Sequence, residues 1–169
     1  MTLSMYQASV PLFRHGFASF AAVLDKAAAH AADKKIDEAV FIQSRLAPDM
    51  LPFSRQIQIA SDGVKGGVAR LAGADIPKME DTETTFAELK ERMAKTDAFI
   101  AGFKPEQIDG SEGKDITLQL GPNAHTFKGQ DYLLKFVIPN FYFHLTTAYA
   151  ILRHNGVEIG KRDFLGPIL

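Results

Sequence analysis

The chain has 169 residues, of which 46% are hydrophobic and 23% are charged, and its formal net charge at pH 7 is -1. This composition is typical of one soluble globular domain, and a charge so close to zero argues against nucleic acid as a partner. The sequence contains no cysteine, which excludes disulfides, thiolate metal sites and cysteine nucleophiles. We therefore expect a single helical-bundle domain over residues 1–169.

The sequence carries no signal for export or for membrane insertion. Residues 1–12 lack the basic region, apolar core and cleavage site of a secretory signal. The longest apolar run, residues 136–152, is interrupted by Pro139, Asn140 and His144 and is shorter than a clean membrane span. We expect a cytoplasmic protein with no membrane partner.

The first predicted helix begins near Tyr6, because apolar residues recur from there at steps of three and four, and it ends near Asp33. Pro11 lies within its early part, so a bend is expected there. Three further apolar residues lie off the main stripe and indicate a second buried face, such as a subunit interface: Met5, Leu12 and Val23.

A short helical turn is predicted over residues 38–43, before Pro48 and Pro52. The second long helix then runs over residues 53–71 and stops at Gly73. One of its sides is almost bare because it carries Gly63, Gly66 and Gly67. Glycines inside a helix cost about 1 kcal/mol each, so we expect either a close approach of another helix or a functional groove on this side.

The third helix is predicted by a capping-box pattern, Thr85-Phe86-Ala87-Glu88. Apolar and polar residues alternate over residues 116–120, and the turn Gly121-Pro122-Asn123 follows. This pattern predicts a small β-hairpin that covers one end of the bundle, with His125 on its return strand.

The fourth helix is predicted from Gly129 to a left-handed stop at Asn155-Gly156. The tail after it is punctuated by glycine, and we expect it to be extended, with Phe164 and Leu165 packed on the bundle. The fold class is therefore all-α: a four-helix bundle with a small β-hairpin between its third and fourth helices.

His144 is the most informative residue for function, because it lies inside the apolar fourth helix with Asn140 four residues before it. Residues four apart share one helix face, so the amide and the imidazole should point to the same place. Their partner is a metal, a ligand or another buried side chain.

Bundles build their sites from side chains of facing helices, which adds Gln58, Asp62 and Asp97 as candidates. Together with His144, Asp62 could hold zinc or nickel, with water completing the coordination. The structural alternative is a hydrogen-bonded network in which His144 and Asn140 satisfy each other together with Tyr142 or Asp62.

The sequence resembles the bacterial DUF1993 family of uncharacterised proteins over nearly its whole length. The resemblance rests on four segments: Arg55-Gln-Ile-Gln-Ile-Ala-Ser-Asp62 with the stretch to Gly73, Pro139-Asn-Phe-Tyr-Phe-His-Leu-Thr-Thr-Ala-Tyr-Ala-Ile-Leu-Arg-His-Asn-Gly156, Phe86-Ala-Glu-Leu, and Gly160-Lys-Arg-Asp-Phe-Leu-Gly.

That family is similar to the DinB/YfiT-like helical bundles, many of which bind a divalent metal through three histidines. In those bundles one histidine comes from the second helix and two come from an H-x-x-x-H motif on the fourth. His144 matches the second histidine of this motif, Asn140 replaces the first, and helix two offers Gln58 or Asp62. The resemblance thus implies a degenerate DinB-like site with one of three ligands retained, and a homodimer.

Three hypotheses follow, and the sequence leaves open whether the protein is an enzyme. The first is a small-molecule-binding bundle with no cofactor, whose pocket between helices two, three and four uses the five candidate residues Gln58, Asp62, Asp97, Asn140 and His144. The second is a metal-dependent hydrolase or thiol transferase with His144 and Asp62 as ligands of zinc or nickel. The third is a non-catalytic dimeric scaffold.

Overall fold

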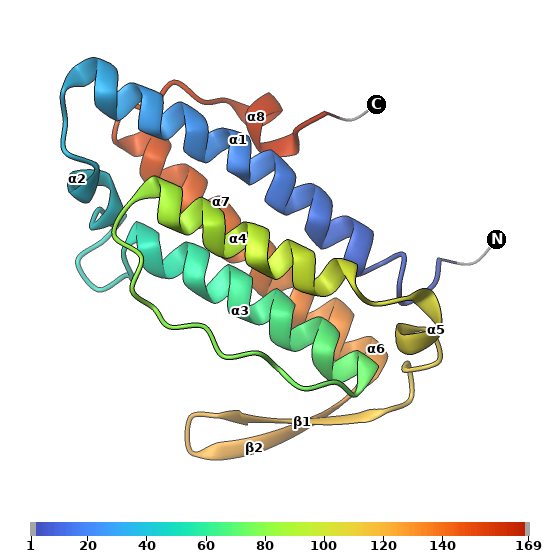
Figure 1. Ribbon diagram of the computed structural model, residues 1–169. Helices are drawn as coiled ribbons and strands as arrows, with labels where there is room; N and C mark the ends of the chain where they lie inside the picture. The colour runs from blue at the N-terminus through green and yellow to red at the C-terminus, as the bar shows by residue number, and fades with distance from the viewer. Residues whose placement is uncertain (1–2, 168–169) are drawn as a thin grey trace.

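The computed structural model of the chain describes residues 3–167, and four long helices dominate it (Figure 1). These are α1 (Val10–Lys34), α3 (Phe53–Ala72), α4 (Phe86–Ala101) and α7 (Ile138–His154). A two-stranded antiparallel sheet, β1 (Asp115–Leu120) with β2 (Asn123–Lys128), lies between α4 and α7 in the chain. The predicted all-α bundle with an inserted hairpin is confirmed.

Two of the long helices, α3 and α4, run parallel to each other. The rings of Phe53 and Phe86, which are the first residues of these helices, lie 5.8 Å apart in an edge-to-face contact. The chain must therefore return along the whole length of α3 before α4 can begin. Residues 74–85 make this return as an irregular connection beside α3, which we call the strap (Figure 1).

The helices α1 and α7 run in the opposite direction to the other two. On α1, Arg14 pairs with Asp97 and Asp25 pairs with Lys90, so an early residue of α1 meets a late residue of α4. On α7, His144 meets Gln56 near the start of α3. The bundle is thus up-down-down-up: α1 lies antiparallel to α4, and α7 lies antiparallel to α3.

The local signals that begin and end the helices act largely as expected. The hydroxyl of Thr85 accepts a hydrogen bond from the Glu88 backbone N–H, and the Thr85 backbone N–H donates to the Glu88 carboxylate, which completes the capping box of α4. Gly73 has a φ of 72°, the left-handed conformation that ends α3. The predicted bend at Pro11 is wrong, because α1 begins at Val10 and proline in the first turn needs no intrahelical donor.

The hairpin packs one face on the bundle. Its register pairs Asp115 with Lys128 and Leu120 with Asn123. Ile116 and Leu118 are buried on that face, whereas Thr117 lies on the exposed face, where its hydroxyl is 2.8 Å from that of Thr126. The alternation read from the sequence is confirmed, and His125 lies on the return strand as predicted.

The fourth helical segment is not one regular helix. It begins as α6 (Gly129–Asp131), widens into the π-helical segment η1 (Tyr132–Val137) and continues as α7. Three aromatic rings, of Phe127, Tyr132 and Phe136, pack against one another with centroids 5.8–6.1 Å apart and join the hairpin to η1. The sequence did not predict this π-helical segment, but the predicted end is confirmed, since Gly156 has a φ of 87°.

The second buried face predicted on the first helix is present, but it packs on the chain's own core and not on a subunit. Met5 and Val23 are buried in that core, and Leu12 is partly buried against it. The tail is not wholly extended, because it forms the short helix α8 (Lys161–Leu165) against α1. Phe164 packs on Tyr149 as expected, whereas the side chain of Leu165 is exposed.

Two shorter helices complete the described chain. The turn predicted over residues 38–43 is present as α2 (Glu38–Ile42), and α5 (Pro105–Ile108) follows α4. None of the helices within residues 3–167 is long and apolar enough to cross a membrane.

Candidate functional site

The site begins with the glycine-lined side of α3, which faces α7. A Cβ atom added to Gly63 would lie 2.9 Å from the Asn140 amide nitrogen, and one added to Gly67 would lie 2.6 Å from Val137. The close helix approach predicted from these two glycines is therefore confirmed. Gly66 points elsewhere, toward the side chain of Arg70.

On the same side of α3, two turns before Gly63, Gln56 meets His144. The distance from His144 Nδ1 to Gln56 Oε1 is 2.7 Å, and both side chains are buried, with His144 8% and Gln56 2% exposed. The amide of Gln56 also donates through Nε2 to the backbone carbonyl of Leu51, at 2.9 Å. Because a carbonyl can only accept, this second contact fixes which end of the amide faces the imidazole.

The protonation of the imidazole follows from this orientation. Gln56 Oε1 is an acceptor, so His144 Nδ1 must carry the hydrogen and donate it. The neutral ring then has an unshared electron pair on Nε2. Burial also lowers the pKa of His144 below its ordinary value of 6.5, which keeps the ring neutral near pH 7. His144 is thus held as an oriented hydrogen-bond acceptor.

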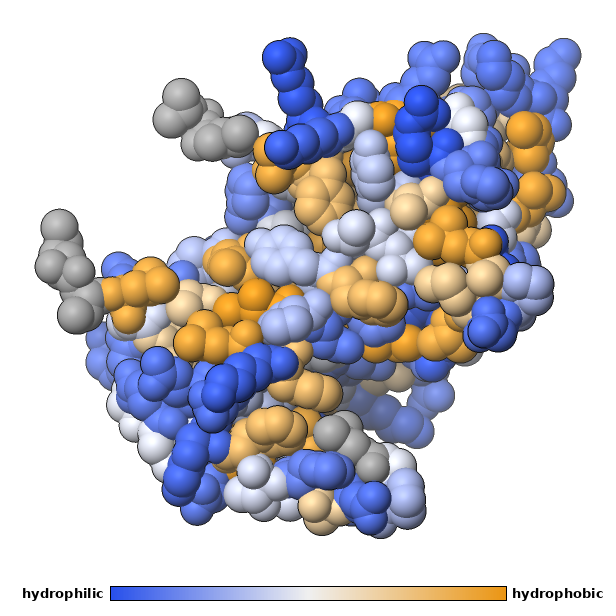
Figure 2. Space-filling view, turned by 180° about the vertical axis from the view of Figure 1, so that it is seen from behind, coloured by the Kyte–Doolittle hydropathy of each residue, from blue (hydrophilic) through white to orange (hydrophobic). Residues whose placement is uncertain are grey.

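The surface around Phe143, the residue before this histidine, is apolar and open. The ring of Phe143 is edge-on to that of His144, with centroids 5.2 Å apart, and is 58% exposed. A groove of about 430 Å³ lies beside it, lined by residues of α7 and by one residue of the α2–α3 connection: Pro139, Tyr142, Phe143, Thr146, Thr147, Ala150 and Leu46. The face that carries α7 shows apolar side chains scattered among hydrophilic ones (Figure 2).

Two of the predicted site residues, Gln58 and Asp62, belong to a different cluster. Gln58 donates to Glu83 on the strap at 2.8 Å and accepts from Arg55 at 2.7 Å. Asp62 accepts from Arg92 of α4 at 3.0 Å. Both lie on the side of α3 that faces α4 and the strap, because six residues from Gln56 to Asp62 turn a helix by about 240°.

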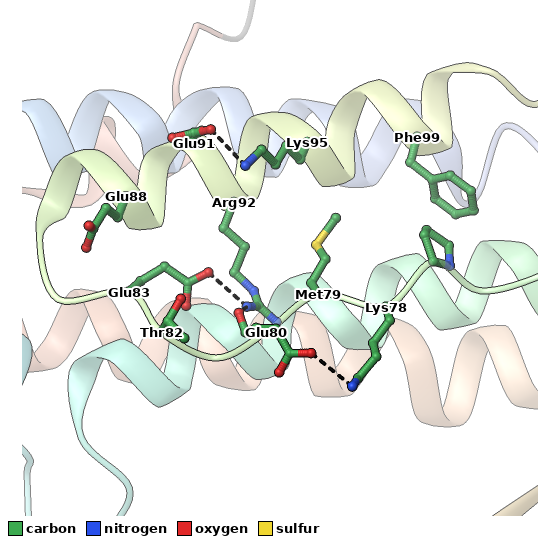
Figure 3. A pocket seen from close by; sticks show the side chains of 11 residues that line it. Lys78, Met79, Glu80, Thr82, Glu83, Glu88, Glu91, Arg92, Lys95 and Phe99 are labelled. Carbon is green, nitrogen blue, oxygen red and sulfur yellow. Dashed lines mark hydrogen bonds and ion pairs between the residues drawn. The ribbon is translucent and has the colours of Figure 1, made fainter.

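Arg92 is the centre of this second cluster and is 1% exposed in its side chain. Besides Asp62, its guanidinium contacts Asp81 and Glu83 at 2.9 Å each and the carbonyl of Glu80 at 3.0 Å. Burial opposes the charge, but the carboxylates outweigh it and raise the pKa of Arg92 above its ordinary value. Figure 3 shows this side chain reaching from α4 to the strap.

Asp97 lies apart from the other four predicted site residues. Its carboxylate accepts from Arg14 of α1 at 2.9 Å, across the opposite side of α4. Asp97 follows Arg92 by five residues, which places the two side chains about 140° apart around the helix. Of the five predicted residues, the structure therefore places only Asn140 and His144 together on the seam between α3 and α7.

Gln56 is the site residue that sequence reasoning missed. A signal for it is present, because Gln56 precedes Gly63 by seven residues and so lies on the side of α3 that the glycines mark. Gln58 and Asp62 were predicted instead because they are four apart, a spacing that also describes the face toward α4. The predicted network paired His144 with Asn140, Tyr142 or Asp62, whereas its hydrogen-bond partner in the structure is Gln56.

The side chains at the α3–α7 seam do not fit the three-histidine metal centre of the DinB-like bundles. Within residues 3–167, no three His, Asp or Glu side chains lie close enough together to hold an ion. The groups on either side of His144 are Gln56 and Asn140, whose neutral amides are poor ligands for zinc or nickel. Asp62, the predicted second ligand, is paired with Arg92 instead.

Comparison with known proteins identifies the family. The model of DUF1993, a domain of unknown function, matches residues 5–165. A solved DinB family member protein from Shewanella denitrificans is 41% identical and has a TM-score of 0.87, with 96% of this chain and 92% of that chain covered. No curated protein matches the chain. The chain belongs to the DUF1993 family and has the fold of a DinB family protein.

Proposed function

We propose that this protein is a small-molecule-binding helical bundle whose recognition group is the neutral imidazole of His144. The observation that carries the proposal is the hydrogen bond between His144 Nδ1 and Gln56. It fixes the ring and leaves Nε2 as an acceptor, and within residues 3–167 the ring makes no other hydrogen bond. A buried and oriented acceptor of this kind is what a binding site for a polar ligand needs.

The surroundings favour a ligand with a hydroxyl or amide donor and an apolar body. The donor would face His144 Nε2, and the amide of Asn140, on the same side of α7, could both donate and accept. The apolar body would lie against Phe143 and the adjoining groove. A π-helical segment next to such a place supports the same reading, because π-helical turns inside helices are frequent at functional sites.

The test combines ligand screening with NMR of the imidazole nitrogens. Small polar compounds that raise the melting temperature should move the Nε2 resonance of His144, and their effect should be lost in His144→Gln and Asn140→Ala. His154→Gln is the matched control, because His154 is exposed at the end of α7. Ligands that bind His144→Gln as tightly as the natural protein would contradict the proposal.

The same experiment separates this function from the metal-dependent alternative. Dialysis of untagged protein against zinc or nickel, followed by elemental analysis, should give well below one ion per chain. A stoichiometric ion that is lost in His144→Gln would instead favour a metal-dependent hydrolase or thiol transferase.

We further propose a cytoplasmic homodimer that uses the α7 face. Phe143 is the most exposed apolar ring on the described surface, and Leu46 and Leu134 are also largely exposed. A second copy on this face would cover the open groove beside Phe143. Sedimentation equilibrium should show a dimer that Phe143→Glu dissociates and that Ile76→Glu, a change at an exposed apolar residue of the strap, does not.

A further inference from the structure

The strap is fastened by charge, not by its own secondary structure. Of its four carboxylates, Asp75 and Glu80 are exposed to solvent, and Glu80 pairs only with Lys78 of the strap itself. Asp81 and Glu83 turn toward the helices, where both contact Arg92 and Asp81 also contacts Arg55. The up-down-down-up topology requires a long connection here, but it does not require these inward carboxylates.

Arg92 and the charged side chains of α3 nearest to it carry excess positive charge. Arg55 and Lys65 of α3 and Arg92 of α4 supply three cations, and Asp62 supplies one carboxylate, so their sum is +2. Lys65 is nearly as buried as Arg92 and lies 2.8 Å from Asp62 Oδ1, an ion pair without the geometry of a directed hydrogen bond. Asp81 and Glu83 contribute -2 and neutralise the cluster.

A buried cation without a partner is strongly unfavourable, so this cluster must always be occupied by negative charge. The same hydrogen bonds that hold the strap lower the pKa values of Asp81 and Glu83 against the opposing effect of burial. In the structure, the carboxylates of Asp81 and Glu83 together supply the two negative charges of a dianion.

One donor at the centre of the cluster is left over. The Nε–H of Arg92 is buried and has no hydrogen-bond partner, although the two terminal nitrogens of the same guanidinium make four contacts with Asp62, Asp81, Glu83 and the Glu80 carbonyl. A phosphate carries its acceptor oxygens on one central atom, whereas each carboxylate offers only two. Arginine recognises phosphate through just such paired donors.

We propose that the cluster of Arg55, Lys65 and Arg92 beneath the strap is a binding site for a phosphate dianion, free or as a phosphomonoester, and that Asp81 and Glu83 of the strap occupy it as an internal competitor. Binding would lift the strap, and Arg92, Arg55 and Lys65 would hold the anion. This site is separate from the one at His144, on the other side of α3, so its failure leaves the proposed function untouched.

Competition with a tethered segment sets the conditions for detection. A group held by a short connection competes at an effective concentration in the millimolar range. The natural chain should therefore bind inorganic phosphate only at millimolar concentrations or above. Replacing the inward carboxylates by neutral amides should remove the competing charge, and Asp62 remains as the carboxylate partner of Arg92 and Lys65.

The first experiment titrates inorganic phosphate at constant ionic strength into the natural chain and into two double variants, with binding followed by calorimetry. Asp81→Asn with Glu83→Gln removes the internal competitor, and Asp75→Asn with Glu80→Gln removes the same charge from the exposed side of the strap. The first variant should bind phosphate at least about tenfold more tightly than the natural chain, since two charge-assisted contacts no longer compete, and the second should not. Equal affinity in both would overturn the proposal.

The second experiment uses the natural chain and depends on no variant. Hydrogen exchange of the amides in residues 74–85 should speed up when phosphate replaces chloride, while exchange within α1 stays the same. Unchanged exchange in the strap at saturating phosphate would show that its carboxylates serve only as a fastening. A parallel titration with glycerol 1-phosphate distinguishes a site for free phosphate from one for a phosphomonoester, according to which anion binds more tightly.

Discussion

Gly67 of α3 lies so close to Val137, the last residue of η1, that a Cβ atom on the glycine would be 2.6 Å from Val137 Cγ1. Val137 is buried, so it cannot turn away into solvent. The backbone of α3 thus approaches α7 only because position 67 has no side chain.

The first prediction concerns this contact. Gly67→Ala gains about 1 kcal/mol of helix propensity but forces α3 and η1 apart, and overpacking of this kind costs about 1–3 kcal/mol. We expect a net loss of up to about 2 kcal/mol in the free energy of unfolding by urea. Gly66→Ala is the matched control, since its Cβ would meet only the mobile end of Arg70, and it should be neutral or slightly stabilising. If both variants gain stability alike, close approach is not the reason for the glycine.

The second prediction concerns Arg92. Arg92→Met should lower the free energy of unfolding by about 3 kcal/mol, because breaking a buried ion pair costs about 3–5 kcal/mol and the partly solvated carboxylates of Asp62 and Asp81 recover some of it. Arg14→Met removes an arginine from the half-exposed pair with Asp97 and should cost less than about 1 kcal/mol. Urea denaturation of both variants measures the difference, and equal losses would mean that Arg92 is not a buried anchor.

The third prediction is a pH dependence due to His144. Burial lowers its pKa in the folded state below the ordinary value of 6.5, so the unfolded chain takes up the proton more readily. The stability that the neutral ring contributes is therefore complete above pH 6.5 and is lost as the pH falls from there through the lowered pKa. Between pH 7.5 and pH 5.5 the natural protein should lose more stability than His144→Gln.

His154→Gln is the control for that series and should follow the natural protein, because His154 is exposed. The carboxylates whose pKa values are lowered act in a more acidic range, since their ordinary values are 3.8 and 4.5. A loss of stability that is the same with and without His144 would show that another group is responsible.

The fourth prediction uses Gln56 to recover a metal site. In the DinB-like bundles a histidine of the second helix joins two histidines of the fourth, and the structure puts Gln56, not Gln58, against His144. We expect Gln56→His with Asn140→His to bind one zinc ion per chain. Gln58→His with Asn140→His should not, because Gln58 faces the strap. Elemental analysis after dialysis against zinc decides between them.

The sequence predicted those parts of the fold that depend on neighbours in the chain. The capping box at Thr85, the left-handed stop at Gly73 and the alternation of Ile116 and Leu118 are local signals, and the structure confirms all three. The partner of His144 was not predictable in this way, because it depends on which side of α3 faces α7. That choice is made by packing between helices that are 88 residues apart at this contact.

The two residues on α3 were predicted from a spacing that fits two faces equally well. Gln58 and Asp62 do lie on one side, but the strap and Arg92 cover that side. A long connection between parallel helices leaves no local pattern that says where it will lie. The role of its inward carboxylates, Asp81 and Glu83, follows only from their ion pairs with Arg92 in the folded structure.

The π-helical segment Tyr132–Val137 has a consequence for how the hairpin and the site are joined. One residue more or less in a helix changes the angular phase of everything beyond it by about 100°. Deletion of one residue here would have one of two effects. Either α7 rotates and carries His144 away from Gln56, or the start of η1 rotates and separates Tyr132 from Phe127. The length of the π-helical segment therefore sets the rotational phase between the hairpin contact at Tyr132 and the imidazole of His144.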